Sequence, residues 1–226
     1  MALNFTTSDV VATGYGIKML LYGSAGAGKT VACSTAPSPL IISAEAGLLS
    51  IRKKSIPVVT VATFNEVREA LEWCKSDAKK MGIETICLDS ISEITEVCLT
   101  NEKAKTKDPR AAYGEMANQI IKLVKEFRDL EGFHVVVTAK QTLATDPVTG
   151  AVKAAPTAPG QQVGQALPYL FDEVFHCFTD KDPNGQTYHA LRTKAAFNAE
   201  AKDRSGVLDE IEYPDLSHLV TKMLST

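Results

Sequence analysis

The chain has few of the residue patterns that mark metal-binding or disulfide-stabilised proteins. Its 226 residues include four histidines and five cysteines, with no C-x-x-C pair and no H-E-x-x-H or H-x-x-E spacing. Such spacings hold zinc in proteins, so we expect no structural metal. The cysteines lie mostly in apolar segments and are predicted to be reduced core residues, as in a cytosolic protein.

Charge and hydrophobic length exclude further classes. The net charge is −3, so no overall basic character indicates nucleic acid, and any such site has to be a local patch. No apolar run approaches the length of a membrane span, and the N-terminus has no signal-peptide core. We therefore expect a cytoplasmic protein with no membrane partner.

One motif that is present is highly specific. The apolar stretch 17–22 is predicted to be a buried strand, and a glycine-rich run follows it: Gly23, Ser24, Ala25, Gly26, Ala27, Gly28, Lys29 and Thr30. This is G-x-x-x-x-G-K-[ST] between a strand and a helix start, the context that phosphate binding requires. Backbone N–H groups and the helix N-terminus bind the phosphates. Lys29 reaches the β- and γ-phosphates and the Thr30 hydroxyl ligates Mg²⁺, which predicts ATP and Mg²⁺ as cofactors.

Apolar runs and helical periods alternate along the chain. Strands are predicted at 17–22, 39–43, 57–62, 83–88, 133–138, 173–178 and 187–193. Thr63 with Glu66, and Ser90 with Glu93, form capping boxes that begin helices, and further helices are predicted over 112–130 and from Pro214 to 225. The pattern predicts a single α/β domain over 1–226: a mostly parallel, twisted sheet flanked by helices, with an antiparallel extension at one edge.

Three segments interrupt this alternation. Residues 1–14 are an N-terminal extension. Residues 100–111 hold four cations and no large apolar side chain, and they are predicted to form a basic loop. Residues 142–163 are rich in Ala, Pro, Gly, Thr and Gln and have no hydrophobic period, so we expect a long flexible loop of functional importance.

Polar residues at strand ends complete the predicted phosphate site. Asp89 ends the strand over 83–88 and is the expected carboxylate of the Mg²⁺ shell. Glu45 follows the second strand at the same carboxyl edge of the sheet, where it can polarise the attacking water. Lys140 and Gln141 follow the strand over 133–138, and either can sense the γ-phosphate.

Taken together and in this order, these residues resemble the RecA-like recombinase core over roughly residues 15 to 205. The chain resembles more closely the short RecA-like ATPases of bacteriophages that serve single-strand annealing and recombination, often described as AAA-family ATPases. Gly164-Gln165-Ala166-Leu167, which leads towards the next strand, also matches the RecA-like core, and Ala201-Lys202-Asp203-Arg204, late in the chain, is typical of the phage group.

The resemblance implies a slow ATPase, stimulated by DNA, in the cytoplasm of a bacterial host. It makes Glu45 the catalytic carboxylate and Gln141 the γ-phosphate sensor, acting with Lys29. It also implies a homo-oligomeric filament or ring on single-stranded DNA, with a single-strand-binding protein as a further partner. The DNA contacts expected in the two loops are Lys103, Lys105, Lys107, Arg110 and Lys153. The cations that a neighbouring subunit could supply to the γ-phosphate are Lys194, Lys202 and Arg204.

Two other functions share the phosphate motif. An NTP-dependent switch or assembly factor would use the 142–163 loop to bind a protein. A small-molecule kinase would need a lid with several arginines over the phosphates, and the 142–163 segment contains none. The second loop also contains no aromatic residue for base stacking.

Overall fold

A computed structural model describes residues 6–45, 47–145 and 150–225. One sheet runs through these residues in the order β10-β8-β7-β1-β5-β4-β2-β3, with β6 paired to β5 and β9 paired to β7. Its strands are β1 (Lys18–Gly23), β2 (Pro39–Ser43), β3 (Val58–Thr60), β4 (Thr85–Asp89), β5 (His134–Thr145), β6 (Val152–Thr157), β7 (Glu173–Lys181), β8 (Thr187–Arg192), β9 (Lys202–Asp203) and β10 (Ile211–Glu212).

The centre of the sheet is parallel and its edge is antiparallel. Neighbouring strands from β7 through β1, β5, β4 and β2 to β3 run parallel, whereas β8, β9 and β10 pair antiparallel. The seven strand ranges predicted from the sequence coincide with observed strands, although β5 and β7 run further. The predicted fold class, a mostly parallel α/β sheet with an antiparallel edge, is confirmed.

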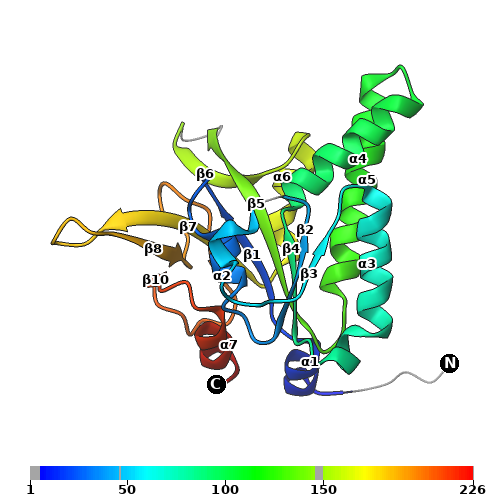
Figure 1. The fold of residues 1–226 in the computed structure, drawn as a ribbon. Helices are drawn as coiled ribbons and strands as arrows, with labels where there is room; N and C mark the ends of the chain where they lie inside the picture. The colour runs from blue at the N-terminus through cyan, green and yellow to red at the C-terminus, as the bar shows by residue number, and fades with distance from the viewer. Residues whose placement is uncertain (1–5, 46, 146–149, 226) are drawn as a thin grey trace.

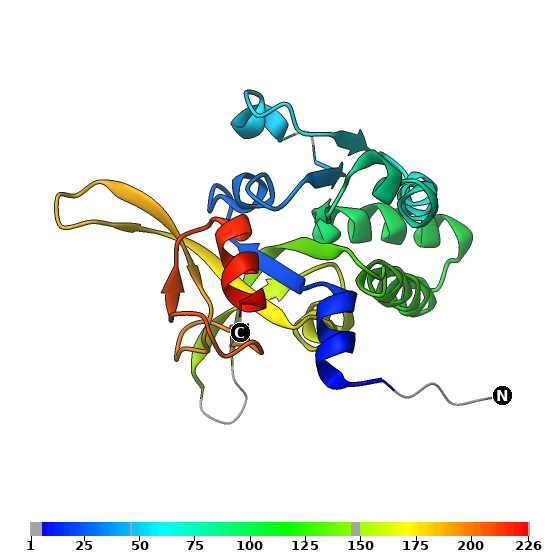
Figure 2. The same cartoon turned by 90° about the horizontal axis from the view of Figure 1, so that it is seen from below.

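Helices cover both faces of this sheet (Figures 1 and 2). The larger core lies under α3 (Phe64–Ser76), α4 (Ile91–Lys105), α5 (Pro109–Arg128) and α6 (Gln161–Leu170). The smaller core lies under α2 (Lys29–Cys33), the 3-10 turn η1 (Leu48–Ile51) and α7 (Leu216–Leu224). Outside these layers lie α1 (Ser8–Tyr15), within the predicted N-terminal extension, and the turn η2 (Ala78–Met81). The free cysteines are all buried.

Local signals explain where the helices begin. Thr63 and Glu66 form the expected reciprocal capping box of α3. At α4 only half of the predicted capping box is present: the Ser90 side chain accepts from the Glu93 N–H, whereas the Glu93 carboxylate pairs with Lys140. The last helix begins at Leu216 rather than Pro214, because the Asp215 side chain caps it by accepting from the His218 N–H.

The basic loop predicted over residues 100–111 is mostly helical. Lys103 and Lys105 belong to the last turn of α4, where cations interact favourably with the helix dipole. Asp108 then caps α5, and Pro109 takes the first helical position. The segment is therefore a tight corner between two helices rather than a loop.

The flexible loop predicted over residues 142–163 is also mostly ordered. β5 continues through Thr145, and β6 pairs with it antiparallel from Lys140↔Thr157 to Thr145↔Val152. Residues 146–149 lie outside the described part of the chain. α6 begins at Gln161. An antiparallel ladder satisfies the backbone groups of both strands, which explains why a segment without a hydrophobic period is regular here.

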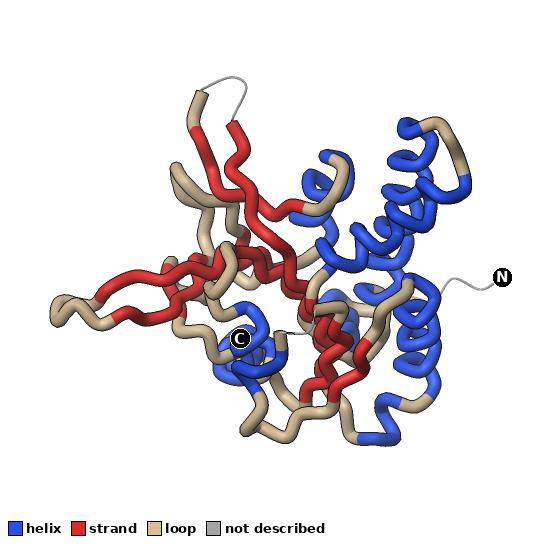
Figure 3. Tube along the Cα trace, turned by 45° about the horizontal axis from the view of Figure 1, so that its top comes forward, coloured by secondary structure: helices blue, strands red, loops and turns tan. Residues whose placement is uncertain are grey.

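The β5–β6 arm and the α4–α5 corner project from the same side of the molecule (Figures 1 and 3). The strands β7 and β8 form a second arm that extends sideways (Figure 2). Strand β5 lies between β1, which leads into the glycine-rich loop, and β4, so it separates the phosphate loop from the strand that ends at Asp89.

Candidate functional site

The glycine-rich loop begins where β1 ends and leads into α2. At Gly23 a Cβ atom would lie 2.3 Å from the carbonyl oxygen of Cys177 in β7, so a larger residue does not fit. Gly28 has a φ of 88°, in the left-handed region that favours glycine, and it immediately precedes the first helical residue. The motif glycines therefore meet requirements of this fold, and the backbone N–H groups of α2 begin directly after the loop.

Lys29 is half-buried and held by the loop itself. Its Nζ donates to the carbonyl oxygens of Gly23 and Ser24, each at 2.9 Å. Phosphate oxygens carry charge and bind an ammonium group more strongly than neutral carbonyls do. Lys29 is therefore positioned at the loop with partners that a nucleotide can displace.

Side chains from α2 and β5 meet at Asp89, the last residue of β4. Thr30 Oγ1 donates to Asp89 Oδ2 at 2.6 Å, and Thr138 Oγ1 donates to Asp89 Oδ1 at 2.5 Å. Asp89 is only 3% exposed. The structure thus brings together Thr30 and Asp89, the residues predicted to hold Mg²⁺.

This donor set fits magnesium. Mg²⁺ prefers oxygen ligands and usually keeps several waters, using few protein groups together with substrate phosphates. In the described residues no three His, Cys, Asp or Glu side chains gather into a metal cluster. A hydroxyl and a carboxylate beside the phosphate loop are what a nucleotide-bound Mg²⁺ requires.

Glu45 lies at the same edge of the sheet. Ser43, the last residue of β2, pairs with Asp89, and Glu45 follows two positions later. The Ser90 hydroxyl donates to Glu45 Oε1 at 2.5 Å, and the Asp89–Ser90 peptide bond is cis. Glu45, the carboxylate that we predicted to polarise water, is therefore hydrogen-bonded to Ser90, the residue after Asp89.

The two sensor candidates have different surroundings. Lys140 Nζ pairs with Glu93 Oε2 at 2.9 Å and with Glu96 Oε1 at 3.0 Å, both on α4. These carboxylates raise the pKa of Lys140. Gln141 instead lies 2.9 Å from the Nε2 atom of His176 on β7. Because Lys140 is paired with two carboxylates of α4, the arrangement favours Gln141 as the sensor.

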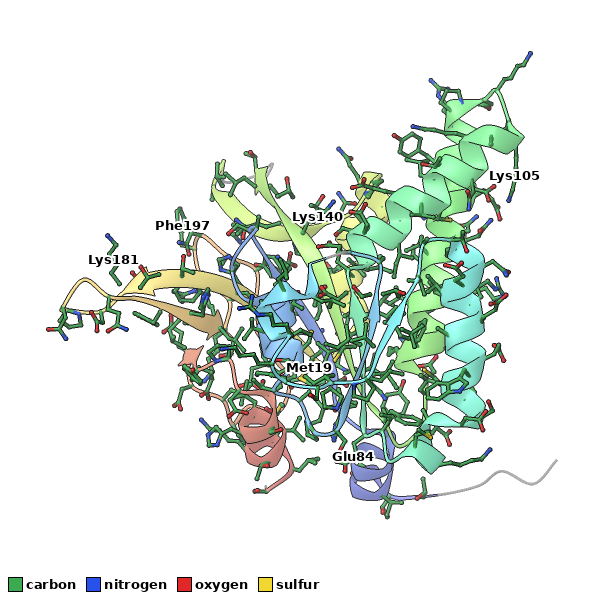
Figure 4. All side chains as sticks on the ribbon, viewed as in Figure 1. Met19, Glu84, Lys105, Lys140, Lys181 and Phe197 are labelled. Carbon is green, nitrogen blue, oxygen red and sulfur yellow. The ribbon has the colours of Figure 1, made fainter. Side chains whose placement is uncertain are left out.

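The predicted DNA-contacting cations lie in two places. Lys103, Lys105, Lys107 and Arg110 surround the α4–α5 corner, and Figure 4 shows Lys105 near its outer end. Lys105 pairs with the buried Glu102 at 2.6 Å, and Lys103 lies 5.2 Å from the centre of the Tyr113 ring. Lys153 lies apart from this group, on β6.

The three cations that a neighbouring subunit could supply to the γ-phosphate differ in the partners that their side chains already have within this chain. Lys202 Nζ donates to Pro168 O at 2.7 Å and to Phe171 O, so it caps the end of α6 in its own chain. Burial lowers its pKa. Arg204 pairs with Asp172 at 2.8 Å, and Lys194 is exposed. The prediction that Lys202 acts on a neighbour does not fit this structural role.

A groove between the β5–β6 arm, α5 and α6 was not foreseen. Its volume is about 980 Å³, and it is lined by Thr142 to Thr145, by Tyr113 and Tyr169, and by Glu200. Sequence reasoning found no aromatic residue in the 142–163 segment. The tyrosines come from other elements, so only the packing of α5 and α6 beside the arm brings them there.

Two residues near the phosphate site were also missed. The register Leu88↔Val137 places Thr138 level with Asp89, a position that only the pairing of β4 with β5 defines. His176 reaches Gln141 across the end of β1. A threonine directly after the apolar run 135–137 was the one available sequence signal.

A family model and a solved structure match the chain. A family model described as "AAA domain" matches residues 15–205. Among curated proteins, no sequence matches. A solved structure of a KaiC-like protein from the hyperthermophilic archaeon Pyrococcus horikoshii OT3 is 13% identical, with a TM-score of 0.40. That likeness covers 78% of this chain and 77% of the other. Among the described residues, no helix is both long and apolar enough to cross a membrane.

Proposed function

The chain belongs to the AAA domain family and is a P-loop ATPase, and from that premise we propose that it couples ATP hydrolysis to the binding of single-stranded DNA. In this proposal copies of the chain assemble on the DNA as a filament or ring. The biological setting is phage recombination and strand annealing, with a single-strand-binding protein as a further partner. ATP hydrolysis is slow and is stimulated by DNA.

For hydrolysis, the observation that supports the proposal is the convergence at Asp89. Thr30 and Thr138 donate to its two oxygens. Glu45 accepts a hydrogen bond from Ser90, the residue that follows Asp89. We assign Thr30 and Asp89 to Mg²⁺, Lys29 to the β- and γ-phosphates, and Glu45 to the attacking water. When bound, Mg²⁺ would neutralise charge that develops on the transferred phosphoryl group.

For DNA, the supporting observation is the groove beside the sensor strand. Thr142, the residue after Gln141, already lines it, and so do Tyr113 and Tyr169, residues that are 38% and 83% exposed. Base–aromatic stacking is largely independent of sequence, as strand annealing requires. Lys103 lies against Tyr113, so bases stacked in the groove would have a cation near their phosphates.

The test is fluorescence anisotropy of a labelled single-stranded oligonucleotide across a salt series. Alanine at both Tyr113 and Tyr169 should weaken binding by at least about 30-fold, because each stacked base contributes about 1–3 kcal/mol and two contacts are lost. Alanine at Lys103, Lys107 and Arg110 should instead flatten the salt dependence, because fewer counterions are released.

The matched control is alanine at Lys75, Lys79 and Lys80, cations of α3 and η2 that lie outside the groove and the α4–α5 corner. This triple variant has the same change in charge and should bind DNA like the unmodified protein. If the tyrosine and corner variants also bind normally, the DNA proposal fails.

One observation favours the second candidate, an NTP-dependent switch that binds a protein. Among the described residues, the groove lining contains no lysine or arginine and includes Glu200, and burial raises the pKa of that glutamate. An uncharged peptide would fit such a lining. Intact ATPase activity without any DNA binding would support this alternative.

A further inference from the structure

His176 and Gln141 meet although a strand separates them in the sheet. His176 lies on β7 and Gln141 on β5, with β1 between them. The last pair of β1 with β5 is Tyr22↔Ala139, so Gln141 extends two residues beyond it, where the chain of β1 becomes the phosphate loop. There its Oε1 atom lies 2.9 Å from Nε2 of His176.

The imidazole ring is held in place from both sides. It stacks on Tyr22 with ring centres 5.1 Å apart, and on Phe178 with ring centres 5.8 Å apart. Tyr22 is itself fully buried, and its hydroxyl donates to Ala154 O of β6 at 2.9 Å. The plane of the ring is therefore fixed, in part by the strand that leads into the phosphate loop.

The surroundings also determine which nitrogen carries the proton. Burial, and to a lesser extent the positive charge of Arg192, lowers the pKa of His176, so the ring is neutral. Its Nδ1 atom is buried and has no hydrogen-bond partner among the described residues. Nε2, in contrast, faces the amide oxygen of Gln141, which can only accept. The proton therefore sits on Nε2 and is donated to Gln141.

This bond uses the oxygen end of the Gln141 carboxamide and leaves its N–H₂ end without an acceptor in the described part of the chain. We propose that His176 is a positioning residue that turns the carboxamide of Gln141 so that its N–H₂ group faces the γ-phosphate of a bound triphosphate. The inference rests on the proposed function, in which Gln141 is the sensor. A phosphate accepts N–H donors and repels an amide oxygen, so an amide free to rotate would discriminate less well.

The decisive measurement is the ratio of the dissociation constants for a non-hydrolysable ATP analogue and for ADP, which lacks the γ-phosphate. His176→Phe keeps an aromatic ring between Tyr22 and Phe178 but removes the donor. It should weaken binding of the ATP analogue by about 3- to 10-fold, the effect of one neutral hydrogen bond, and leave ADP binding unchanged. His176→Gln, which can place an N–H near the same oxygen, should restore the ratio in part.

A double-mutant cycle tests whether His176 acts through Gln141. Gln141→Leu alone should weaken binding of the ATP analogue, and adding His176→Phe to it should cost nothing more. The matched control is His134→Phe, a half-buried histidine at the start of β5 that accepts from the Ile17 N–H. It should leave the ratio unchanged.

Each contrary result has a distinct meaning. If Gln141→Leu leaves the ratio unchanged, the sensor role of Gln141 fails and this inference fails with it. If Gln141→Leu raises the ratio but His176→Phe does not, only the role of His176 is overturned. The same holds if His176→Phe weakens ATP and ADP binding equally, because that result would mark a structural residue.

Discussion

Two lysines, Lys18 at the start of β1 and Lys29 at the end of the glycine-rich loop that follows this strand, show how one residue type serves two purposes. Lys18, at the amino end of β1, is 1% exposed and donates to the carbonyls of Tyr15, Leu130 and Phe133 at 2.7, 3.0 and 2.7 Å. Burial lowers its pKa to about 8, so it still carries its charge at neutral pH. Lys29, beyond the carboxyl end, is half-buried and donates only to two carbonyls of the loop in the described structure.

The difference follows from the direction of the strands. At the carboxyl ends of parallel strands the chain opens into loops and helix starts, and ligands bind there. Lys29, Asp89 and Glu45 lie at that edge. At the amino edge, Lys18 and Glu173 are buried among backbone groups. Substitution of charged residues at the carboxyl edge should therefore change nucleotide binding and hydrolysis, and substitution of charged residues at the amino edge should change the stability of the fold.

The largest expected effect separates the two lysines directly. Lys29→Ala should abolish tight binding of a non-hydrolysable ATP analogue, because the loop keeps its amides but loses the cation aimed at the phosphates. Isothermal titration calorimetry measures this loss, and the midpoint of urea unfolding should hardly change. Unaltered affinity in the variant would refute the assignment of the phosphate loop.

A second change at the carboxyl edge should affect turnover alone. Glu45→Gln should lower the rate of ATP hydrolysis by about two to four orders of magnitude, the range for loss of a general base. The substitution is nearly isosteric, so the affinity for the ATP analogue should be kept. If steady-state hydrolysis continues at the original rate, another group activates the water.

At the amino edge, a substitution should lower stability and leave nucleotide binding unchanged. Lys18→Met fills similar space but leaves three buried carbonyls without their donor. The free energy of unfolding, from urea titration, should fall by about 2–4 kcal/mol. Nucleotide affinity of the folded protein should be unchanged. A variant as stable as the unmodified protein, or one that binds ATP poorly while folded, would remove the contrast between the edges.

The smallest expected effect depends on pH. Burial raises the pKa of Glu173 to about 7, although the Ser205 N–H donates to one oxygen. Because the folded pKa lies above the unfolded one, the contribution of this group to stability is complete below about pH 4.5 and is lost as pH rises through 7. Glu173→Gln should therefore stabilise the protein by about 1–3 kcal/mol at pH 8 and by little at pH 4.5.

The control for this prediction is Glu84→Gln, an exposed carboxylate at the same edge of the sheet, beside β4 (Figure 4). Urea unfolding at both pH values should show no comparable difference for it. An equal pH dependence in Glu173→Gln and in the unmodified protein would mean that Glu173 does not titrate in this range.

Most of the framework could be predicted from the sequence because its signals are local. The phosphate loop follows from glycines at fixed spacing after an apolar strand. The strands follow from apolar runs, and the starts of α3 and α4 follow from Thr63 and Ser90 as caps. Asp89 and Glu45 were found because parallel strands place their carboxyl ends at one edge, a rule that needs no knowledge of the pairing.

Other features depend on contacts between segments far apart in the chain. Thr138 donates to Asp89 across 49 positions, and His176 meets Gln141 across 35. Residues 142–145 and 152–157 have no hydrophobic period, and their order comes from the backbone pairing of β6 with a strand that begins in the core.

By itself, the sequence determined that the protein binds a nucleoside triphosphate, because the loop that does so is built from eight consecutive residues. Only the tertiary structure decided that Lys18 is buried for stability, which partners Asp89 has, and what holds the sensor. Those outcomes depend on strand order and register, since a shift of one residue in a strand turns every side chain to the opposite face.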